Sequence, residues 1–231
     1  MTMTNSSNTL EVSGGFVRLD AAMADDLSVV NSARVSFAQE STEMSEKDVG
    51  LIRFLMRERH GTPFEHNAFR FHVKCPIFVA REWFRHRIGS FNEFSARYSE
   101  MPNEFYVPEP EDVRTQTGKP GAYTFEPVGE KLAAETVAMI ETSCERAYEV
   151  YSHLIERGVA KELARVVLPV GMFTQFYWTV NARSLMNFLS LRTHDTAQKD
   201  IREYANAVLE LARPVMPITF DAWDAAGRQT P

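Results

Sequence analysis

This sequence lacks an excess of basic charge. Its 231 residues hold 25 Lys and Arg against 31 Asp and Glu, which gives a formal net charge of −6. A surface that wraps nucleic acid or an anionic membrane needs a basic field, so the composition argues against both as general partners. Where basic residues do gather in this chain, they therefore indicate a local site.

Cysteine is scarce, with only Cys75 and Cys144 in the chain. Their spacing suits neither a metal site nor a disulfide framework, so we expect two small buried side chains in a reducing compartment. The start, MTMTNSSNTLEVSGG, lacks the cationic and apolar regions of a secretion signal. No run approaches the ~18 apolar residues of a spanning helix, so the sequence predicts a cytoplasmic protein without a membrane segment.

The common phosphate-binding and metal motifs are missing too. No G-x-G-x-x-G and no G-x-x-x-x-G-K-[ST] occurs, so neither Rossmann-type nor P-loop binding is supported. His60, His66 and His72 are evenly spaced, but six-residue steps on a strand or loop do not bring them together, and we predict no metal. Ser95 and Cys75 are formal nucleophiles without a readable histidine and carboxylate beside them, which disfavours covalent catalysis by either.

Hydrophobic periodicity predicts an alternation of helices and strands. Strands are expected at 15–21 and 68–74, the second with Phe69, Phe71 and Val73 on its buried face. Helices are expected from Asp25, from Ser45, from Pro76 and over 128–157, 160–168, 182–192 and 197–213. Residues 172–180 are a strand by propensity, although a buried helix is nearly as compatible with their composition. The domain organisation predicted is a disordered tail at 1–14, one catalytic domain over 15–215 with a long surface excursion at 107–127, and a C-terminal tail at 216–231.

One stretch, RHRIGSFNEFSARYSE at residues 85–100, brings basic and hydroxyl side chains close together in the sequence. Together with Arg81 from the helix before it, the stretch provides four arginines and three hydroxyl side chains. They are Arg81, Arg85, Arg87, Arg97, Ser90, Ser95 and Tyr98. Arginine holds phosphate through two parallel hydrogen bonds, which favours a phosphorylated small molecule. The competing interpretation is a solvated helix end whose arginines pair with nearby acids. Asn92-Glu93 inside the cluster favours a ligand with a sugar hydroxyl or ring N–H as well, as in a nucleotide.

Arg85-His86-Arg87, followed after seven residues by Ser95, resembles the R-H-R-x7-S signature of flavin-dependent thymidylate synthases. Further blocks similar to that family keep their order and approximate spacing along about residues 15–215. They are Thr62-Pro63-Phe64-Glu65-His66, Asn92-Glu93, Ala164-Arg165-x-x-Leu168-Pro169, Asn181-Ala182-Arg183-Ser184-Leu185-x-Asn187-Phe188 and Leu191-Arg192.

The resemblance implies an α+β fold with a mixed or antiparallel sheet flanked by helices in a single domain. It also implies a homotetramer with active sites shared between subunits. The implied reaction converts dUMP to dTMP, with FAD as cofactor, methylenetetrahydrofolate as the one-carbon donor and NADPH as reductant. Hydride supplied by reduced flavin removes the need for an enzyme thiol, which agrees with the lack of a convincing Cys/His pair.

Carried over by position, the resemblance implies two sets of site residues. The flavin set is Arg85, His86, Arg87, Glu93, Asn181, Arg183 and Asn187, with Thr62 from another subunit. The nucleotide set is Glu82, Arg85, Ser95, Arg97 and Arg165, with the phosphate held mainly by Ser95, Arg97 and Arg165. Arg192 is placed against the pyrimidine as the catalytic residue, where a permanently protonated guanidinium polarises the ring carbonyls.

Two positions depart from the family pattern. Glu82 stands where many relatives have glutamine, and an acid beside a phosphate repels it unless it is aimed elsewhere or paired with an arginine. Thr196 stands where the family often has histidine, while His194 lies two residues earlier. These differences leave open a UMP or dUMP methylase of modified-nucleoside biosynthesis, with the same chemistry. A non-catalytic protein that binds flavin or nucleotide is a further alternative.

Overall fold

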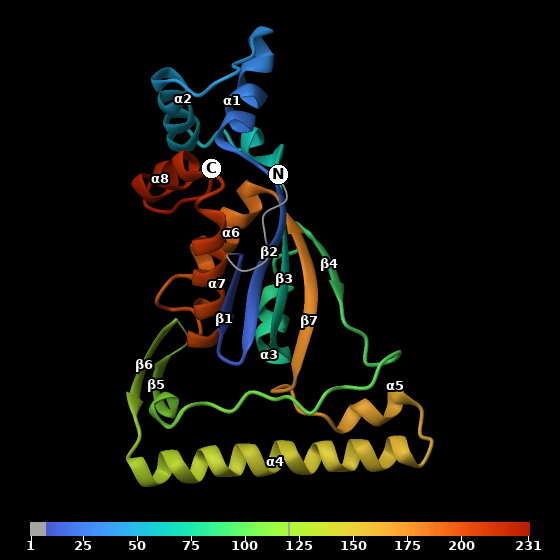
Figure 1. Cartoon of the computed structure of the whole chain (residues 1–231). Coiled ribbons are helices and arrows are strands. Elements are labelled where there is room, and N and C mark those ends of the chain that lie inside the picture. The colour runs from blue at the N-terminus through green and yellow to red at the C-terminus, as the bar shows by residue number, and fades with distance from the viewer. Residues whose placement is uncertain (1–7, 120) are drawn as a thin grey trace. The chain divides into compact units, whose positions relative to one another are not determined.

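The computed structural model describes residues 8–119 and 121–231, and the chain divides into two compact units. The first comprises the chain up to Lys74, Glu82–Asn92 and Gln175–Pro231. The second comprises Cys75–Arg81 and Glu93–Thr174. Figure 1 shows the helices and strands of both units.

A five-stranded sheet, which lies mainly in the first unit, has the strand order β1-β2-β3-β7-β4. Its strands are β1 (Thr9–Val12), β2 (Gly15–Met23), β3 (Ala68–Pro76), β7 (Phe173–Val180) and β4 (Ser90–Glu93). The pairs β1–β2 and β2–β3 are antiparallel, with a register shift between Leu19 and Ala21. An antiparallel sheet together with helices confirms the predicted α+β fold class.

One face of the sheet is apolar, as the alternating pattern predicts. Phe69, Phe71 and Val73 of β3 are fully buried, and Phe176 and Trp178 of β7 join them. Residues 172–180 are therefore mainly a strand, because this aromatic, β-branched segment supplies alternate side chains to the buried face. Helices α6 (Ala182–Arg192) and α7 (Lys199–Ala212) lie along the sheet in Figure 1 and contribute to the same core.

A second group of helices in the first unit consists of α1 (Asp26–Arg34), α2 (Glu46–Arg57), the 3-10 turns η1 (Val35–Phe37) and η2 (Thr62–Glu65), and α8 (Pro217–Ala225). Helix α8 lies where a C-terminal tail was expected, so that expectation is wrong. Pro217 begins the helix at a position that needs no N–H donor. The buried carboxylate of Asp26 accepts hydrogen bonds from the backbone N–H groups of Ile218 and Thr219 and from the Thr219 hydroxyl.

The expected disordered tail at the N-terminus is also wrong from residue 9 onward; residues 1–7 lie outside the described part of the chain. Thr9–Val12 form β1, which pairs with β2 across a turn at Ser13 and Gly14. Both turn residues have positive φ, a conformation that glycine adopts freely. The Tyr204 hydroxyl of α7 donates to the carbonyl of Val12 at 2.9 Å and fixes the end of the strand.

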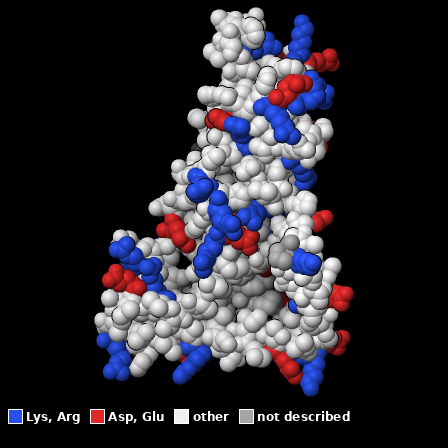
Figure 2. Space-filling view, turned by 180° about the vertical axis from the view of Figure 1, so that it is seen from behind, with Lys and Arg blue, Asp and Glu red and all other residues white. Residues whose placement is uncertain are grey.

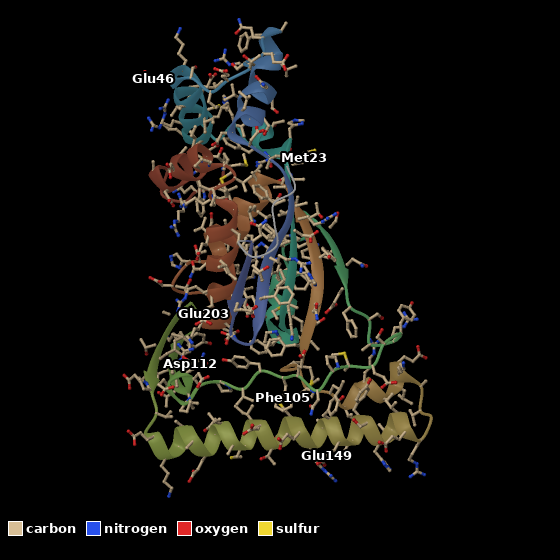
Figure 3. All side chains as sticks on the ribbon, viewed as in Figure 1. Met23, Glu46, Phe105, Asp112, Glu149 and Glu203 are labelled. Carbon is tan, nitrogen blue, oxygen red and sulfur yellow. The ribbon has the colours of Figure 1, made fainter. Side chains whose placement is uncertain are left out.

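The second unit is built on the long helix α4 (Glu130–Glu156), as predicted for 128–157. Gly158 follows it with φ of +79°, the left-handed conformation typical of a residue after a helix end. Tyr151 of α4 is buried with Met101 and Met172 in a small core, and its hydroxyl accepts the N–H of Met101. Phe105, labelled in Figure 3, lies on the extended segment beside α4 and packs on this core.

The remaining elements of the second unit are short. They are η3 (Pro110–Asp112), the strands β5 (Arg114–Lys119) and β6 (Ala122–Pro127), α5 (Lys161–Ala164) and η4 (Arg165–Val167). The predicted surface excursion at 107–127 thus contains an exposed two-stranded hairpin that the periodicity did not reveal. Helix α3 (Ile77–Trp83) begins in the second unit and ends in the first. Within the described ranges, no helix is both long and apolar enough to cross a bilayer.

Candidate active site

The first unit contains a cavity of about 980 Å³ whose wall is rich in arginine. Arg85, Arg87, Arg183 and Arg192 line it, and Glu65 is the one acid among its lining residues. Its volume falls within the range of small-molecule sites. These four guanidinium groups outnumber the one acidic side chain of the lining, so the cavity attracts anions.

Two helix ends and one loop position the side chains of this cavity. Helix α3 ends at Trp83, and the following segment carries Arg85, His86 and Arg87. Helix α6 begins after Asn181, whose side-chain oxygen accepts the N–H of Ser184 as an N-cap. Arg192 is the last residue of α6, where the negative end of the helix dipole favours a cation.

Arg192 is held at three of its nitrogen atoms. Its Nη1 donates to Glu82 Oε2 at 2.9 Å, its Nη2 to the Glu82 carbonyl oxygen at 3.3 Å and its Nε to His86 Nε2 at 3.0 Å. The Arg192 and Glu82 side chains are 18% and 26% exposed, so this ion pair is partly shielded from water. It is more enclosed than the Arg183–Glu65 pair, whose side chains are 44% and 38% exposed.

The environment shifts the pKa values of both partners of Arg192. Burial, and then the positive charges of Arg192 and Arg85, lower the pKa of His86 to about 4. His86 is therefore neutral at physiological pH, and its Nε2 accepts the hydrogen bond that the Arg192 Nε–H donates. Burial raises the pKa of Glu82, with a smaller contribution from Asp200, while Arg192 and Arg85 oppose the shift.

Arg85 and Arg87 differ from Arg192 in being open to solvent. Both guanidinium groups are exposed, and among residues 8–119 and 121–231 neither has an acidic partner within ion-pair distance. Arginines without carboxylate partners on a cavity wall are suited to bind an anionic ligand, and their planar forks match phosphate oxygens. The residues present thus fit the diphosphate of a dinucleotide cofactor.

Thr62 lies in a neighbouring cavity of about 940 Å³ in the same unit. Arg183 lines both cavities: its Nη1 pairs with Glu65 and its Nε donates to the carbonyl of Pro231 at 2.8 Å. The structure therefore brings Arg85, His86, Arg87, Asn181, Arg183, Asn187 and Arg192 to one cavity and Thr62 to the next.

Glu82 lies in the first unit beside Arg192, and the four other predicted residues lie in the second unit. Glu93 and Arg165 line a small cavity of about 150 Å³, where the Thr174 hydroxyl donates to Glu93 Oε1 at 2.7 Å. Ser95 and Arg97 follow in the chain, and the Ser95 hydroxyl accepts the Arg97 N–H at 3.4 Å. Of this second group, Glu93 and Arg165 thus line the small cavity, whereas Ser95 and Arg97 are not among its lining residues.

Several residues that line these pockets or contact the predicted arginines escaped the sequence-based prediction. Glu65 pairs with Arg183, and the Glu162 carboxylate lies 3.8 Å from Arg97 Nε while its carbonyl accepts from Arg165. Thr230 and Pro231 line the large cavity although a tail was expected there. Only Glu65 had a signal in the sequence, because it belongs to the Thr62–His66 block that carries the resemblance.

Neither cysteine lines any of the three cavities, and both are buried. Burial, and then the charge of Glu93, raises the pKa of Cys75 far above its usual value, so its thiolate is not accessible. His72, one of the three evenly spaced histidines, stacks on Tyr177 and contacts Gln175. Within the described ranges, no group of three or more metal-ligating side chains occurs.

The sequence profile of the family described as "Thymidylate synthase complementing protein" matches residues 18–218. The chain belongs to the flavin-dependent thymidylate synthase family. The flavin-dependent thymidylate synthase of Thermosipho africanus is 50% identical over 209 residues, which cover 90% of each chain. That of Thermus thermophilus is 44% identical over 210 residues, which cover 91% of this chain and 76% of the relative.

Solved structures in this family agree with the fold. The crystal structure of the UMP/dUMP methylase PolB from Streptomyces cacaoi bound with 5-Br dUMP has a TM-score of 0.88 and 42% identity, and covers 95% of this chain and 99% of that one. PolB bound with 5-Br UMP has the same TM-score and identity, and 97% of that chain is covered. On the face shown in Figure 2, Lys and Arg atoms lie in groups with Asp and Glu atoms nearby.

Proposed function

We propose that this chain is an enzyme that methylates C5 of dUMP to give dTMP, with FAD as cofactor, methylenetetrahydrofolate as one-carbon donor and NADPH as reductant. The observation that carries the proposal is the arginine-lined cavity with a constrained Arg192 at its wall. Family membership supports a flavin, and the names of the relatives support a pyrimidine monophosphate as substrate. The cytoplasmic location remains a prediction from the sequence.

The site residues fall into three groups, which would bind the diphosphate and flavin of FAD, the phosphate of the nucleotide, and its pyrimidine ring. Arg85 and Arg87 would hold the diphosphate of FAD, with His86, Asn181, Arg183 and Asn187 around the rest of the flavin and with Glu93 and Thr62 assigned by resemblance. Ser95, Arg97 and Arg165 would hold the nucleotide phosphate. The resemblance assigns Arg85 to the nucleotide as well. When bound and reduced, the flavin would supply hydride, so no enzyme thiol is needed, in agreement with two buried cysteines.

Arg192 is the residue for the pyrimidine. Its guanidinium stays protonated and keeps two of its five N–H donors beyond the three that are used by Glu82 and His86. Directed at a ring carbonyl, these donors would stabilise negative charge on the pyrimidine and raise electron density at C5. In a site shielded from water, such fixed donors lower a barrier by about 3 kcal/mol each.

A second candidate substrate is UMP. The similarity to PolB, which is described as a UMP/dUMP methylase, and Thr196 in place of the family histidine favour this alternative. Turnover of dUMP and UMP compared under identical conditions tests both. A kcat/KM for dUMP well above that for UMP supports the main proposal, and the reverse order supports the alternative.

Lysine substitutions separate phosphate binding from chemistry. We expect Arg97→Lys and Arg165→Lys to raise the KM for the nucleotide about tenfold and to leave kcat within about twofold of the wild-type value. Lysine keeps the positive charge but cannot form the bidentate hydrogen bonds of arginine to phosphate. Steady-state kinetics with varied nucleotide measure this. Arg146→Lys on α4 is the matched control, since that exposed arginine lines none of the three cavities described above. A tenfold loss of kcat without change in KM would remove both residues from the phosphate site.

We also propose a homotetramer with shared active sites. Leu163 and Val166, on either side of the phosphate-site residue Arg165, are 62% and 73% exposed, which suits a surface covered by another subunit. The expected mass in solution is about four times the 26.3 kDa of one chain, measured by light scattering after size exclusion. Val166→Asp should dissociate the assembly and abolish turnover, whereas a monomer that turns over at high dilution would contradict shared sites.

A further inference from the structure

The contact between Glu82 and Arg192 joins two parts of the chain 110 residues apart. Resemblance assigns Glu82 to the nucleotide, but its carboxylate is engaged by Arg192 Nη1 and its carbonyl oxygen by Arg192 Nη2. A carboxylate beside a phosphate dianion is repelled, while the same carboxylate beside a guanidinium is stabilised. The observed partner therefore answers why an acid is tolerated at this position.

The geometry fixes the plane of the guanidinium. Each of its three nitrogens has one partner, His86 for Nε and Glu82 for Nη1 and Nη2, so the group cannot rotate without breaking a hydrogen bond. A free arginine side chain loses considerable rotamer freedom when it is ordered against a ligand. In this chain Glu82 and His86 supply that ordering from within the protein, which is what preorganisation of a catalytic donor requires.

We propose that Glu82 is a positioning residue that holds Arg192 in the orientation needed at the pyrimidine and makes no contact with the nucleotide phosphate. The inference rests on the proposed reaction, because Arg192 acts there on the ring. It implies that Glu82 acts in its ionised form, since a protonated carboxyl loses the charge of the pair. His86 stays neutral and supplies the acceptor for Nε.

The isosteric variant Glu82→Gln tests this assignment, because it keeps the shape and one acceptor and removes the charge. We expect kcat to fall about tenfold, while the dissociation constant of dUMP, measured by calorimetry, stays within about twofold or tightens, since an acid has left an anion site. Asp20→Asn is the matched control: Asp20 is also a partly exposed carboxylate paired with arginine, but on the sheet, away from the cavities, and this variant should keep kcat.

The pH profile provides a readout that a structural role would not change. The charged or titratable groups facing Glu82 are Arg192 on α6, Asp200 on α7, and Arg85 and His86 after α3. As pH falls through the raised pKa of Glu82, the carboxylate gains a proton and the ion pair is lost, so the kcat of the wild type should decline on the acid side. Glu82→Gln should lack that decline, and Asp20→Asn should retain it.

A measurement independent of turnover follows the Arg192 Nε–H proton by NMR, assigned by its absence in Arg192→Lys. Its exchange with solvent should be at least about tenfold faster in Glu82→Gln than in the wild type and unchanged in Asp20→Asn. Weaker dUMP binding by tenfold with unchanged kcat would make Glu82 a direct ligand and overturn the inference, as would unchanged exchange. A wild type without turnover on dUMP or UMP, but with slow exchange that Glu82→Gln accelerates, would overturn the proposed reaction and support the holding of Arg192.

Discussion

Arg192→Lys should lower kcat for dUMP by about 100-fold or more, with the KM for the nucleotide within about threefold. Lysine keeps one positive charge but offers a single ammonium in place of a planar fork, so it cannot satisfy Glu82 and His86 and still present donors to a ring carbonyl. The comparison needs kcat and KM from the same titration, together with the thermal midpoint to show that the variant is folded.

The reduction of flavin by NADPH should persist in Arg192→Lys, because the change lies on the nucleotide side of the reaction. Stopped-flow measurement of that half-reaction provides the control. If kcat stays within about twofold and only KM rises, Arg192 belongs with the phosphate ligands and not with the pyrimidine.

Arg87→Ala should yield protein that is folded but nearly free of flavin. Arg87 is exposed on the cavity wall and has no acidic partner within the described ranges, so its removal takes away an anion contact and no core packing. A charge-assisted hydrogen bond contributes about 1.5–3 kcal/mol, which corresponds to roughly 10–100-fold weaker binding of FAD. Flavin absorbance per chain, before and after reconstitution, measures the loss.

Arg70→Ala is the matched control for Arg87→Ala. Arg70 is likewise an exposed arginine of the first unit, but it pairs with Asp20 on the sheet and lines none of the cavities. This variant should bind FAD like the wild type. Equal flavin content in both variants would remove Arg87 from the flavin site, and loss of flavin in both would point to an indirect effect.

Local patterns in the sequence predicted the helices and strands that are determined by residues close together in the sequence. The alternation of Phe69, Phe71 and Val73 identified β3 and its buried face, and Gly158 marked the end of α4. Helix α8 escaped because its N-terminus is capped by Asp26, which is 192 residues away from Ile218, and no local signal reports such a contact. The exposed hairpin β5–β6 escaped because it has no buried face to create a pattern.

In the candidate site, too, residues within local motifs were predicted and residues that depend on distant contacts were not. Motifs that resemble the family supplied the arginines and asparagines of the large cavity, because those residues occur in short blocks. Glu162 and Thr230 lie outside these blocks and could not be found without the fold. The role of Glu82 was undetermined in the sequence, since an acid near an anion site is compatible with several partners, and the tertiary contact with Arg192 identifies the one present.

The most direct test of the proposed function is the formation of dTMP by the purified protein, followed by chromatography and mass spectrometry. The reaction contains dUMP, FAD, methylenetetrahydrofolate and NADPH, and parallel reactions omit each component in turn. We expect dTMP in the complete mixture and none when any one of the four is left out, provided that the protein is first stripped of flavin. Failure to form dTMP by protein that binds both FAD and dUMP, or dTMP formed without flavin, would contradict the account.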